Sequence, residues 1–141
     1  MEKYQNPTEI EALLTNKGAT WAVVGLSKNR ERPAYHVTRT IKDELGMNII
    51  PINPRGESAY GIEGYKTIKD IKEPIDVVDC FVNSENVGEI VDQAIEIKAK
   101  AVWLQLGVIN EVAAKRAQKA GLIVVVDTCP VIQGRKLGLF S

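Results

Sequence analysis

A glycine followed two residues later by a serine, in a stretch rich in basic residues, could hold a phosphate group. The stretch runs Val24-Gly25-Leu26-Ser27-Lys28-Asn29-Arg30-Glu31-Arg32-Pro33. Gly25 lets the backbone turn and approach a phosphate closely, and Ser27 adds a hydroxyl group. A helix that begins at about Pro33 would add unpaired N–H groups and the positive end of its dipole. Because the stretch matches neither a Walker A loop nor G-x-G-x-x-G, a solvated turn stays an open alternative.

An arginine follows a second apolar run, at the point where a site for NAD would place an acidic residue. The chain reads Asn53-Pro54-Arg55-Gly56 there, and no carboxylate comes before Glu57. An acidic side chain would accept a hydrogen bond from the ribose 2′-hydroxyl of NAD. The planar guanidinium of Arg55 instead suits a ribose phosphate, unless it is an ordinary surface residue of a turn. The two stretches together favour a nucleotide with a pyrophosphate and a ribose phosphate, which describes both NADP and coenzyme A (CoA).

The cysteines and the single histidine offer little for catalysis. Cys129 follows the last apolar run, so its thiol either packs beside Pro130 or faces a ligand with which it could exchange. Cys80 lies inside an apolar run and is expected to be inert core. A chain whose only histidine is His36 cannot assemble a histidine cluster, and its cysteines lack the spacing of a metal site. We therefore expect no metal site and no general acid–base pair.

Five apolar, β-branched runs must supply the strands that position these residues. They are Trp21–Leu26, Asn48–Asn53, Ile75–Val82, Ala101–Leu106 and Leu122–Asp127. The runs are continuous rather than alternating, which indicates strands buried on both faces of a sheet. Helical patterns between them indicate βαβ units with right-handed crossovers. We predict a Rossmann-like α/β fold: an open parallel five-stranded sheet in the order 3-2-1-4-5, within three αβα layers.

Two further stretches predict local structure. Asn6 precedes Pro7, and Glu9 follows three residues beyond this cap, which predicts an N-terminal helix over about residues 7–17. The stretch Glu57–Glu73 contains two glycines and one short helical candidate at Thr67–Ile71, so we expect a poorly formed crossover there. In an open parallel α/β sheet like the one predicted here, ligands bind beyond the carboxyl ends of the strands, at the point where the strand order reverses.

Length and charge limit the classes of function. The chain has 141 residues, which fits one domain over residues 1–141. Its 18 basic and 18 acidic residues cancel, so no net charge draws it to nucleic acid, and its apolar runs are too short to cross a membrane. The N-terminus carries no apolar leader, and we expect a cytoplasmic protein. Five strands and their helices leave little chain for catalytic machinery.

Five segments, in this order along the chain, resemble the small stand-alone CoA-binding domain family. They are Val23–Ser27 with Arg32-Pro33, Pro51–Arg55, Ile75–Phe81, Ala101–Gly107 and Val126–Pro130. This family is similar to the N-terminal nucleotide-binding domain of the succinyl-CoA synthetase α-subunit, and the resemblance covers about Trp21–Leu137. It implies a Rossmann-like domain that holds CoA across the carboxyl edge of its sheet. Thr128 departs from the family pattern, which often has arginine at that position.

The resemblance implies which residues contact each part of CoA. Gly25 and Ser27 would meet the pyrophosphate, with Arg32 nearby. The adenosine 3′-phosphate would be bordered by Asn53, Pro54 and Arg55.

Towards the other end of CoA, Val82 and Asn83 would line the adenine or pantetheine side. Gln105 and Gly107 would flank the pantetheine arm, with Cys129 on the same edge.

We predict a non-catalytic protein that binds CoA or a short acyl-CoA in storage, sensing or protection. Three alternatives stay open: the nucleotide-binding component of an acyl-CoA synthetase complex, an NADP-dependent oxidoreductase, and a redox-responsive interaction module acting through Cys129. The N-terminal helix either covers the sheet or packs against a second chain in a homodimer.

Overall fold

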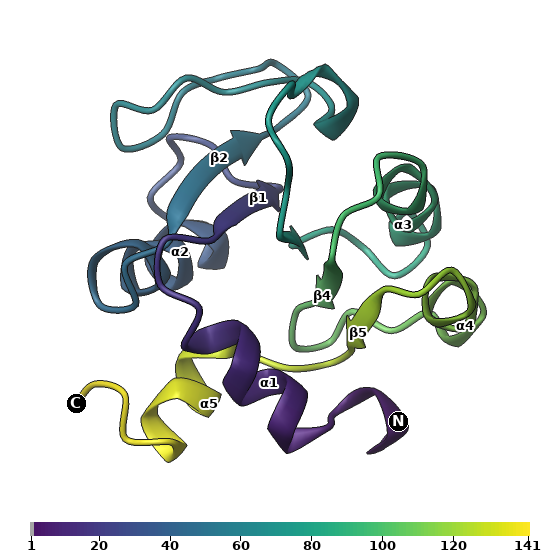
Figure 1. Ribbon diagram of the computed structural model, residues 1–141. Helices are drawn as coiled ribbons and strands as arrows, with labels where there is room; N and C mark the ends of the chain where they lie inside the picture. The colour runs from purple at the N-terminus through teal and green to yellow at the C-terminus, as the bar shows by residue number, and fades with distance from the viewer. Residues whose placement is uncertain (1) are drawn as a thin grey trace.

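A parallel five-stranded sheet forms the centre of the computed structural model, which describes residues 2–141, with side chains from residue 3 (Figure 1). Its strands are β1 (Thr20–Val24), β2 (Asn48–Ile52), β3 (Val77–Cys80), β4 (Ala101–Leu104) and β5 (Ile123–Val125). Nearly all strand residues are buried, because helices cover both faces of the sheet. The five predicted strands are therefore confirmed, with somewhat shorter bounds.

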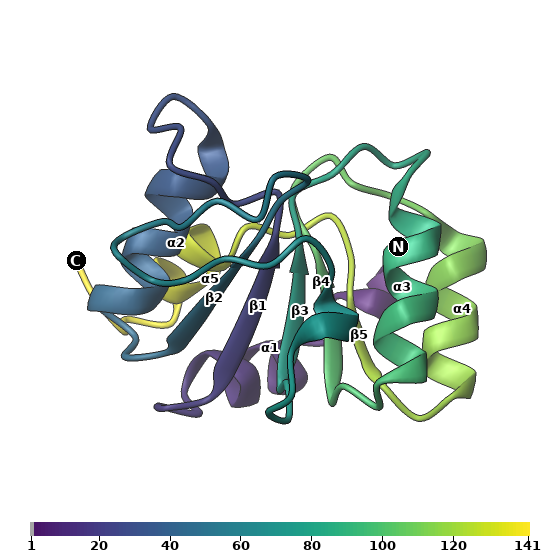
Figure 2. The same cartoon turned by 90° about the horizontal axis from the view of Figure 1, so that it is seen from above.

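Five helices form the outer layers. They are α1 (Pro7–Leu14), α2 (Pro33–Asp43), α3 (Val87–Glu96), α4 (Glu111–Lys119) and α5 (Pro130–Lys136), with short 3₁₀ turns at η1 (Glu2–Tyr4) and η2 (Ile68–Asp70). Helices α1, α2 and α5 lie on one face of the sheet, and α3 and α4 lie on the other (Figure 2). This is the predicted αβα arrangement of three layers.

Each face of the sheet has its own apolar core. Trp21 of β1 and Trp103 of β4 are fully buried beside α1, α2 and α5, with ring centroids 5.6 Å apart. On the opposite face, Cys80 packs among the apolar residues that face α3 and α4, as predicted for an inert core residue. Small residues such as Ala94 and Ala117 are fully buried there, which lets these helices lie close to the sheet.

The N-terminal helix covers the sheet. Ile10, Leu13 and Leu14 of α1 are buried in the same core as the two tryptophans. The Asn6 side chain accepts a hydrogen bond from the Glu9 N–H at 3.0 Å, which confirms the predicted cap. The helix ends at Leu14, three residues before the predicted end. None of the helices within residues 2–141 is both long enough and apolar enough to cross a membrane.

The strand order is β2-β1-β3-β4-β5, so the prediction of 3-2-1-4-5 was wrong in the position of β3. Strand β1 lies between β2 and β3, with Ala22 opposite both Ile50 and Val78. The crossover from β2 to β3 buries Ile68 of η2 on the face of α3 and α4, whereas α2 lies on the other face. Crossovers are right-handed, so the face on which a crossover packs determines the side on which the next strand is added. The crossover from β2 to β3 packs on the face opposite α2, so the chain passes back across β1 and β3 pairs on its other side.

Candidate functional site

Every residue predicted to contact a ligand lines a hollow at the carboxyl ends of the strands. Three of these hollows adjoin one another at Gly25, which lines each of them. Gly25 follows β1 at the point where the strand order reverses between β1 and β3. The ligand site expected at a reversal of strand order therefore lies between β1 and β3, rather than between β1 and β4.

The first hollow, here called the apolar hollow, has a volume of about 430 Å³. It is lined mostly by apolar atoms, from Gly25, Arg32, Pro33, Ala34, Val37, Phe81, Val82, Asn83, Gln105, Leu106, Val108 and Cys129. The predicted residues Val82, Asn83, Gln105 and Cys129 therefore come together in one place. An apolar lining with a few polar groups is typical of small-molecule sites.

The second hollow, here called the basic hollow, lies between the loops that follow β1 and β2. Its volume is about 630 Å³, and it is lined by Gly25, Ser27, Lys28, Asn29, Arg32, Asn53, Pro54, Arg55, Glu57 and Phe81. Both predicted phosphate-binding stretches face it. The structure thus brings together residues that are far apart in the sequence but follow neighbouring strands.

The third hollow, here called the crossover hollow, was only partly foreseen. Its volume is about 340 Å³, and it is lined by Val24, Gly25, Ile52, Asn53, Pro54, Lys66, Thr67, Ile68, Val82, Glu89, Ile90 and Gln93. The sequence indicated the residues that follow strands, but not those from the crossover or from α3. The sequence feature that pointed to the crossover residues was the short helical candidate at Thr67–Ile71. Its packing against α3 follows from the strand order and could not be predicted from the sequence.

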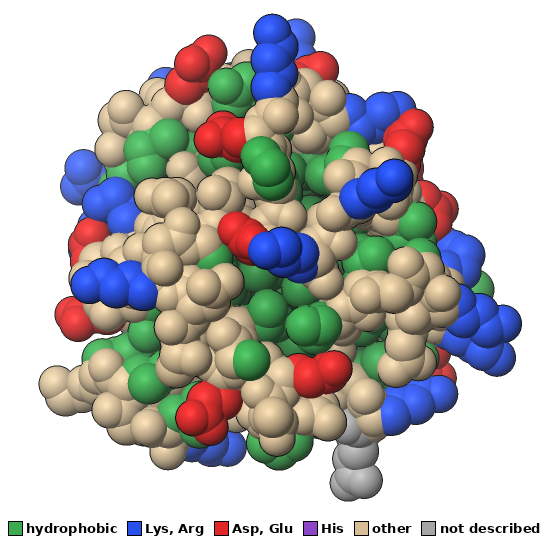
Figure 3. All heavy atoms as spheres, in the orientation of Figure 1, with side chains coloured by type: hydrophobic (Ala, Val, Ile, Leu, Met, Phe, Trp, Pro, Cys, Tyr) green, Lys and Arg blue, Asp and Glu red, His purple; other side chains and the backbone are tan. Residues whose placement is uncertain are grey.

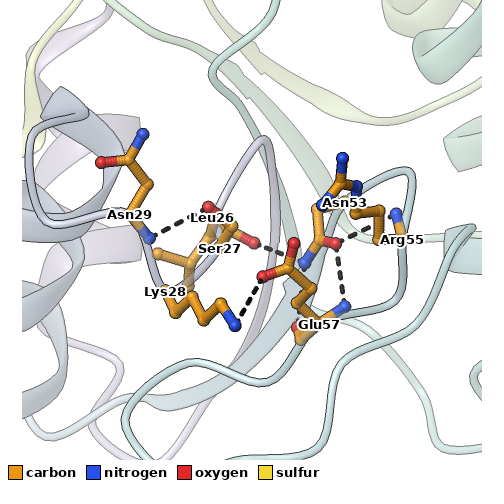
Figure 4. A network of polar contacts seen from close by, with 7 residues as sticks. All are labelled: Leu26, Ser27, Lys28, Asn29, Asn53, Arg55 and Glu57. Atoms are coloured by element: carbon orange, nitrogen blue, oxygen red, sulfur yellow. Dashed lines mark hydrogen bonds and ion pairs between the residues drawn. The ribbon is translucent and has the colours of Figure 1, made fainter.

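The side chain of Asn53 shapes the basic hollow from within (Figure 4). Its Nδ2 donates to the carbonyl oxygens of Leu26 and Glu57, each at 2.9 Å. Its Oδ1 accepts from the N–H groups of Arg55 at 3.2 Å and Glu57 at 2.9 Å. All the hydrogen-bonding capacity of this buried amide is therefore used within the protein. Asn53 joins the two loops and holds the backbone of Arg55, so its side chain is not free to bind a phosphate.

Two arginines of the basic hollow carry uncompensated charge. Glu57 also lines this hollow, but its carboxylate lies 3.7 Å from the ammonium group of Lys28. Among the described residues, neither Arg32 nor Arg55 forms an ion pair within 4 Å. On the face drawn in Figure 3, by contrast, basic and acidic side chains are interspersed. The net charge of zero therefore conceals a local excess of positive charge.

The first turn of α2 adds to this positive potential. Arg32 is its N-cap residue and makes no capping hydrogen bond through its side chain, and Pro33 follows at the first helical position. The first turn contains no acidic residue, unlike the first turns of α1, α3 and α4. Arg32 lines both the basic and the apolar hollow, whereas Pro33 and Ala34 line only the apolar one. The positive end of the α2 dipole therefore lies where these two hollows adjoin, with no acidic residue in the first turn.

Gly25 is required by the packing of the protein itself. Its φ is +101°, and a Cβ atom at this position would lie 2.4 Å from the carbonyl oxygen of Phe81. Gly107 also has a positive φ, +84°, but the space around it is open. The Gly107 N–H donates to Asp127 Oδ1 at 2.7 Å, and its carbonyl accepts from Ser84 Oγ at 3.3 Å. Gly107 therefore forms a turn beside the apolar hollow rather than part of its wall.

A buried carboxyl group lies behind the apolar hollow. Asp79 of β3 is fully buried, and its Oδ1 accepts a short hydrogen bond from the side-chain amide of Gln105. Burial raises the pKa of Asp79 to about 7, although hydrogen bonds from Gln105 and the Cys80 N–H oppose this shift. The carboxyl group therefore changes its charge near neutral pH.

These features define a doubly wound α/β domain with three adjoining hollows at the reversal of its strand order, where sheets of this kind bind ligands. Residues 19–135 match the family model described as CoA binding domain. The chain belongs to this family, as the sequence resemblance predicted.

Relatives differ in how much chain surrounds this domain. The uncharacterized protein YneT of Bacillus subtilis is 33% identical over 126 residues, which is 89% of this chain and 93% of that protein. A solved structure of a hypothetical protein from Pyrococcus horikoshii OT3 is 36% identical, with a TM-score of 0.85 over 94% of this chain and 92% of that one. The ADP-forming acetate–CoA ligase of Methanocaldococcus jannaschii is 31% identical over 72 residues, which is 51% of this chain but 10% of the ligase.

The first prediction concerns the two glycines with positive φ. Gly25→Ala should lower the free energy of unfolding by about 3 kcal/mol or more, because strain at positive φ adds to a clash with backbone. Gly107→Ala, the matched control, has the strain without the clash and should lose about 1 kcal/mol. Urea unfolding measures both values. Equal losses would contradict the close contact between Gly25 and Phe81.

The second prediction concerns stability and pH. The folded protein holds a proton on Asp79 up to about pH 7, whereas an unfolded aspartate loses it near its ordinary pKa of 3.8. The contribution of Asp79 to stability therefore falls as the pH rises between these values and is constant above them. Asp79→Asn lacks this pH-dependent contribution. The free energy of unfolding of the variant, relative to that of the wild type, should therefore rise from pH 4 to pH 8 by up to about 4 kcal/mol. Urea unfolding across this range tests this, and parallel curves would refute it.

Proposed function

We propose that this protein binds CoA, or a short acyl-CoA, across the carboxyl edge of its sheet without catalysing a reaction. The observation that carries the proposal is the meeting of three hollows at Gly25, each with a lining that suits a different part of CoA. Membership of the CoA-binding domain family supports the same ligand.

The phosphate groups suit the basic hollow. The unpaired guanidinium groups of Arg32 and Arg55 supply donors for phosphate oxygens, and Arg32 also marks the positive end of the α2 dipole. Ser27 Oγ accepts from the Asn29 N–H at 3.2 Å, which leaves its own O–H free to donate. We assign the pyrophosphate to Ser27 and Arg32, and the 3′-phosphate to Arg55.

The adenine ring suits the crossover hollow. Ile52, Ile68, Val82 and Ile90 contribute apolar surface that a planar ring can contact, and Thr67 and Gln93 add polar groups to the lining. This hollow and the basic hollow share Asn53 and Pro54. An adenosine with its ring in the crossover hollow therefore has its 3′-phosphate directed to the basic hollow.

The pantetheine arm suits the apolar hollow. Gln105 and Asn83 offer polar groups among apolar walls, matching the amides that punctuate this arm. Cys129 also lines this hollow and is partly exposed. It is the N-cap residue of α5, and its side chain makes no capping hydrogen bond. NADP has no comparable flexible arm, so the apolar hollow favours CoA over NADP.

The lining also supports a non-catalytic role. His36 lies outside the three hollows, with its ring edge against Tyr35 at a centroid distance of 5.9 Å. Glu57 lines the basic hollow and is paired with Lys28, and Glu89 lines the crossover hollow, so no two carboxylates line the same hollow. An arrangement of general acid and base is therefore not supported. A cytoplasmic setting and a homodimer remain predictions.

The third prediction tests the ligand and the role of Arg55. CoA should raise the thermal midpoint more than dephospho-CoA, NADP or NAD, because a ligand of the native state stabilises it. Arg55→Ala should weaken CoA binding by about 1–3 kcal/mol and leave dephospho-CoA binding nearly unchanged. Arg116→Ala is the matched control, because Arg116 pairs with Asp92 on the surface, outside the hollows.

Two results of this titration would argue against the proposal. A response to NADP but not to CoA would favour the oxidoreductase alternative. Equal losses for CoA and dephospho-CoA in Arg55→Ala would show that Arg55 does not contact the 3′-phosphate.

The fourth prediction tests whether Cys129 faces the ligand thiol. With CoA disulfide, the Cys129 thiolate should attack one sulfur, forming a protein–CoA disulfide and releasing one CoA thiolate. Intact mass should then increase by one CoA, and dithiothreitol should reverse the change. Cys129→Ser should remove the adduct, whereas the fully buried Cys80 should form none. Absence of any reductant-sensitive adduct would show that Cys129 is a packing residue.

A further inference from the structure

Asp79 is a buried carboxyl group that the contacts proposed for CoA do not use. Its Oδ2 has no hydrogen-bond partner among the described residues. Val23 of β1 and Trp103 of β4 lie opposite it in the sheet, and neither carries a charge. Since side chains alternate along β3, Asp79 faces the same side as α2, whose buried Thr38 is also uncharged.

Among the described residues, the thiol of Cys80 is a titratable neighbour of Asp79, on the opposite face of β3. Burial and the charge of Asp79 both raise the pKa of Cys80, so this thiol stays neutral. Within the part of the chain that the structure describes, no basic side chain forms an ion pair with Asp79. The Gln105 amide is therefore its principal polar partner.

Gln105 connects this carboxyl group to the apolar hollow. It follows β4, its side chain is almost fully buried, and it lines the hollow. An ionised carboxylate can only accept hydrogen bonds, so it holds the amide nitrogen of Gln105 against itself. The amide oxygen is then left as the acceptor for an N–H donor within the hollow.

We propose that Asp79 is a positioning residue whose carboxylate fixes the Gln105 amide with its oxygen towards the ligand, and that proton uptake by Asp79 releases this orientation. The inference rests on the proposed function, because the pantetheine arm of CoA carries two amide N–H groups that such an oxygen can accept. A protonated Asp79 can both donate and accept, so it tolerates either orientation of the amide.

The expected pH dependence has a definite sign. Because the pKa of Asp79 lies near 7, both of its forms are populated around neutral pH. CoA binding is strengthened as the pH rises through this value, since the charged form holds the amide in the orientation that matches an N–H donor. Exchanging a charge-assisted hydrogen bond for a neutral one should change the affinity by about fivefold.

Calorimetric titration of the purified protein with CoA between pH 6 and pH 8.5, in the presence of reductant, tests the inference. The variants are Asp79→Asn, which matches the neutral acid in shape, and the control Asp76→Asn. Asp76 pairs with Lys100 at 3.2 Å before β3 begins, at the opposite edge of the sheet. The phosphate monoester of CoA also titrates near pH 6. Its effect is common to all the proteins, so the ratio of wild-type to variant affinity isolates Asp79.

The wild type should gain about fivefold in affinity over Asp79→Asn as the pH rises, whereas its ratio to Asp76→Asn stays constant. Gln105→Met, which keeps the length of the side chain and removes the amide, should also lose this pH dependence. It provides the same comparison if Asp79→Asn does not fold. A constant ratio to both Asp79→Asn and Gln105→Met overturns the inference.

A measurement without ligand separates the inference from the proposed function. In ¹H–¹⁵N spectra, the side-chain amide resonances of Gln105 should shift with a midpoint near pH 7 in the wild type and stay constant in Asp79→Asn. If CoA fails to bind at any pH while these resonances shift, the proposed function fails and the role of Asp79 in holding Gln105 stands. If CoA binds and the resonances do not shift, the positioning role is overturned.

Discussion

The site depends on the position of β1 between β2 and β3. These two parallel strands are reached by crossovers on opposite faces of the sheet. The chain leaves β1 through α2 on one face, reaches β2, and returns across β1 on the other face to form β3. The loops after β1 and β3 therefore diverge, and a crevice opens between them. Gly25 and Phe81 close the floor of this crevice through a backbone contact too tight for any side chain at Gly25. The three hollows meet at this point.

Internal hydrogen bonds shape the loops and leave the charged groups free. Asn53 uses all of its amide capacity to join the loops that follow β1 and β2, and Glu57 is paired with Lys28. Arg32 and Arg55 are left with their charges directed to solvent beside an uncapped helix end. The backbone of these loops is therefore held by the protein's own hydrogen bonds, whereas the two arginine side chains are not. Asp79 and Gln105 form a similar support behind the apolar hollow, but one whose charge changes near neutral pH.

Much of the site followed from the sequence because parallel strands end at the same edge. Once the five apolar runs were recognised, the residues after each run had to gather at one edge, whichever strands were neighbours. This is why residues such as Ser27, Arg55 and Gln105 all line hollows there. Their contacts with a ligand remain predictions. The role of Asn53 could not be foreseen, because its partners Leu26 and Glu57 are brought to it by the pairing of β1 with β2.

The sequence by itself determined the elements: five buried strands, the helices that begin at Pro7 and Pro33, and the inert position of Cys80. These depend on local composition and periodicity, which the chain carries wherever it is placed. Only the tertiary structure decided the position of β3, the crossover hollow and the contact of Asp79 with Gln105. The reason is that the crossover from β2 to β3 lacks a long amphipathic helix. The face on which it packs is therefore set by the burial of a few residues such as Ile68 against α3, and not by a periodic pattern.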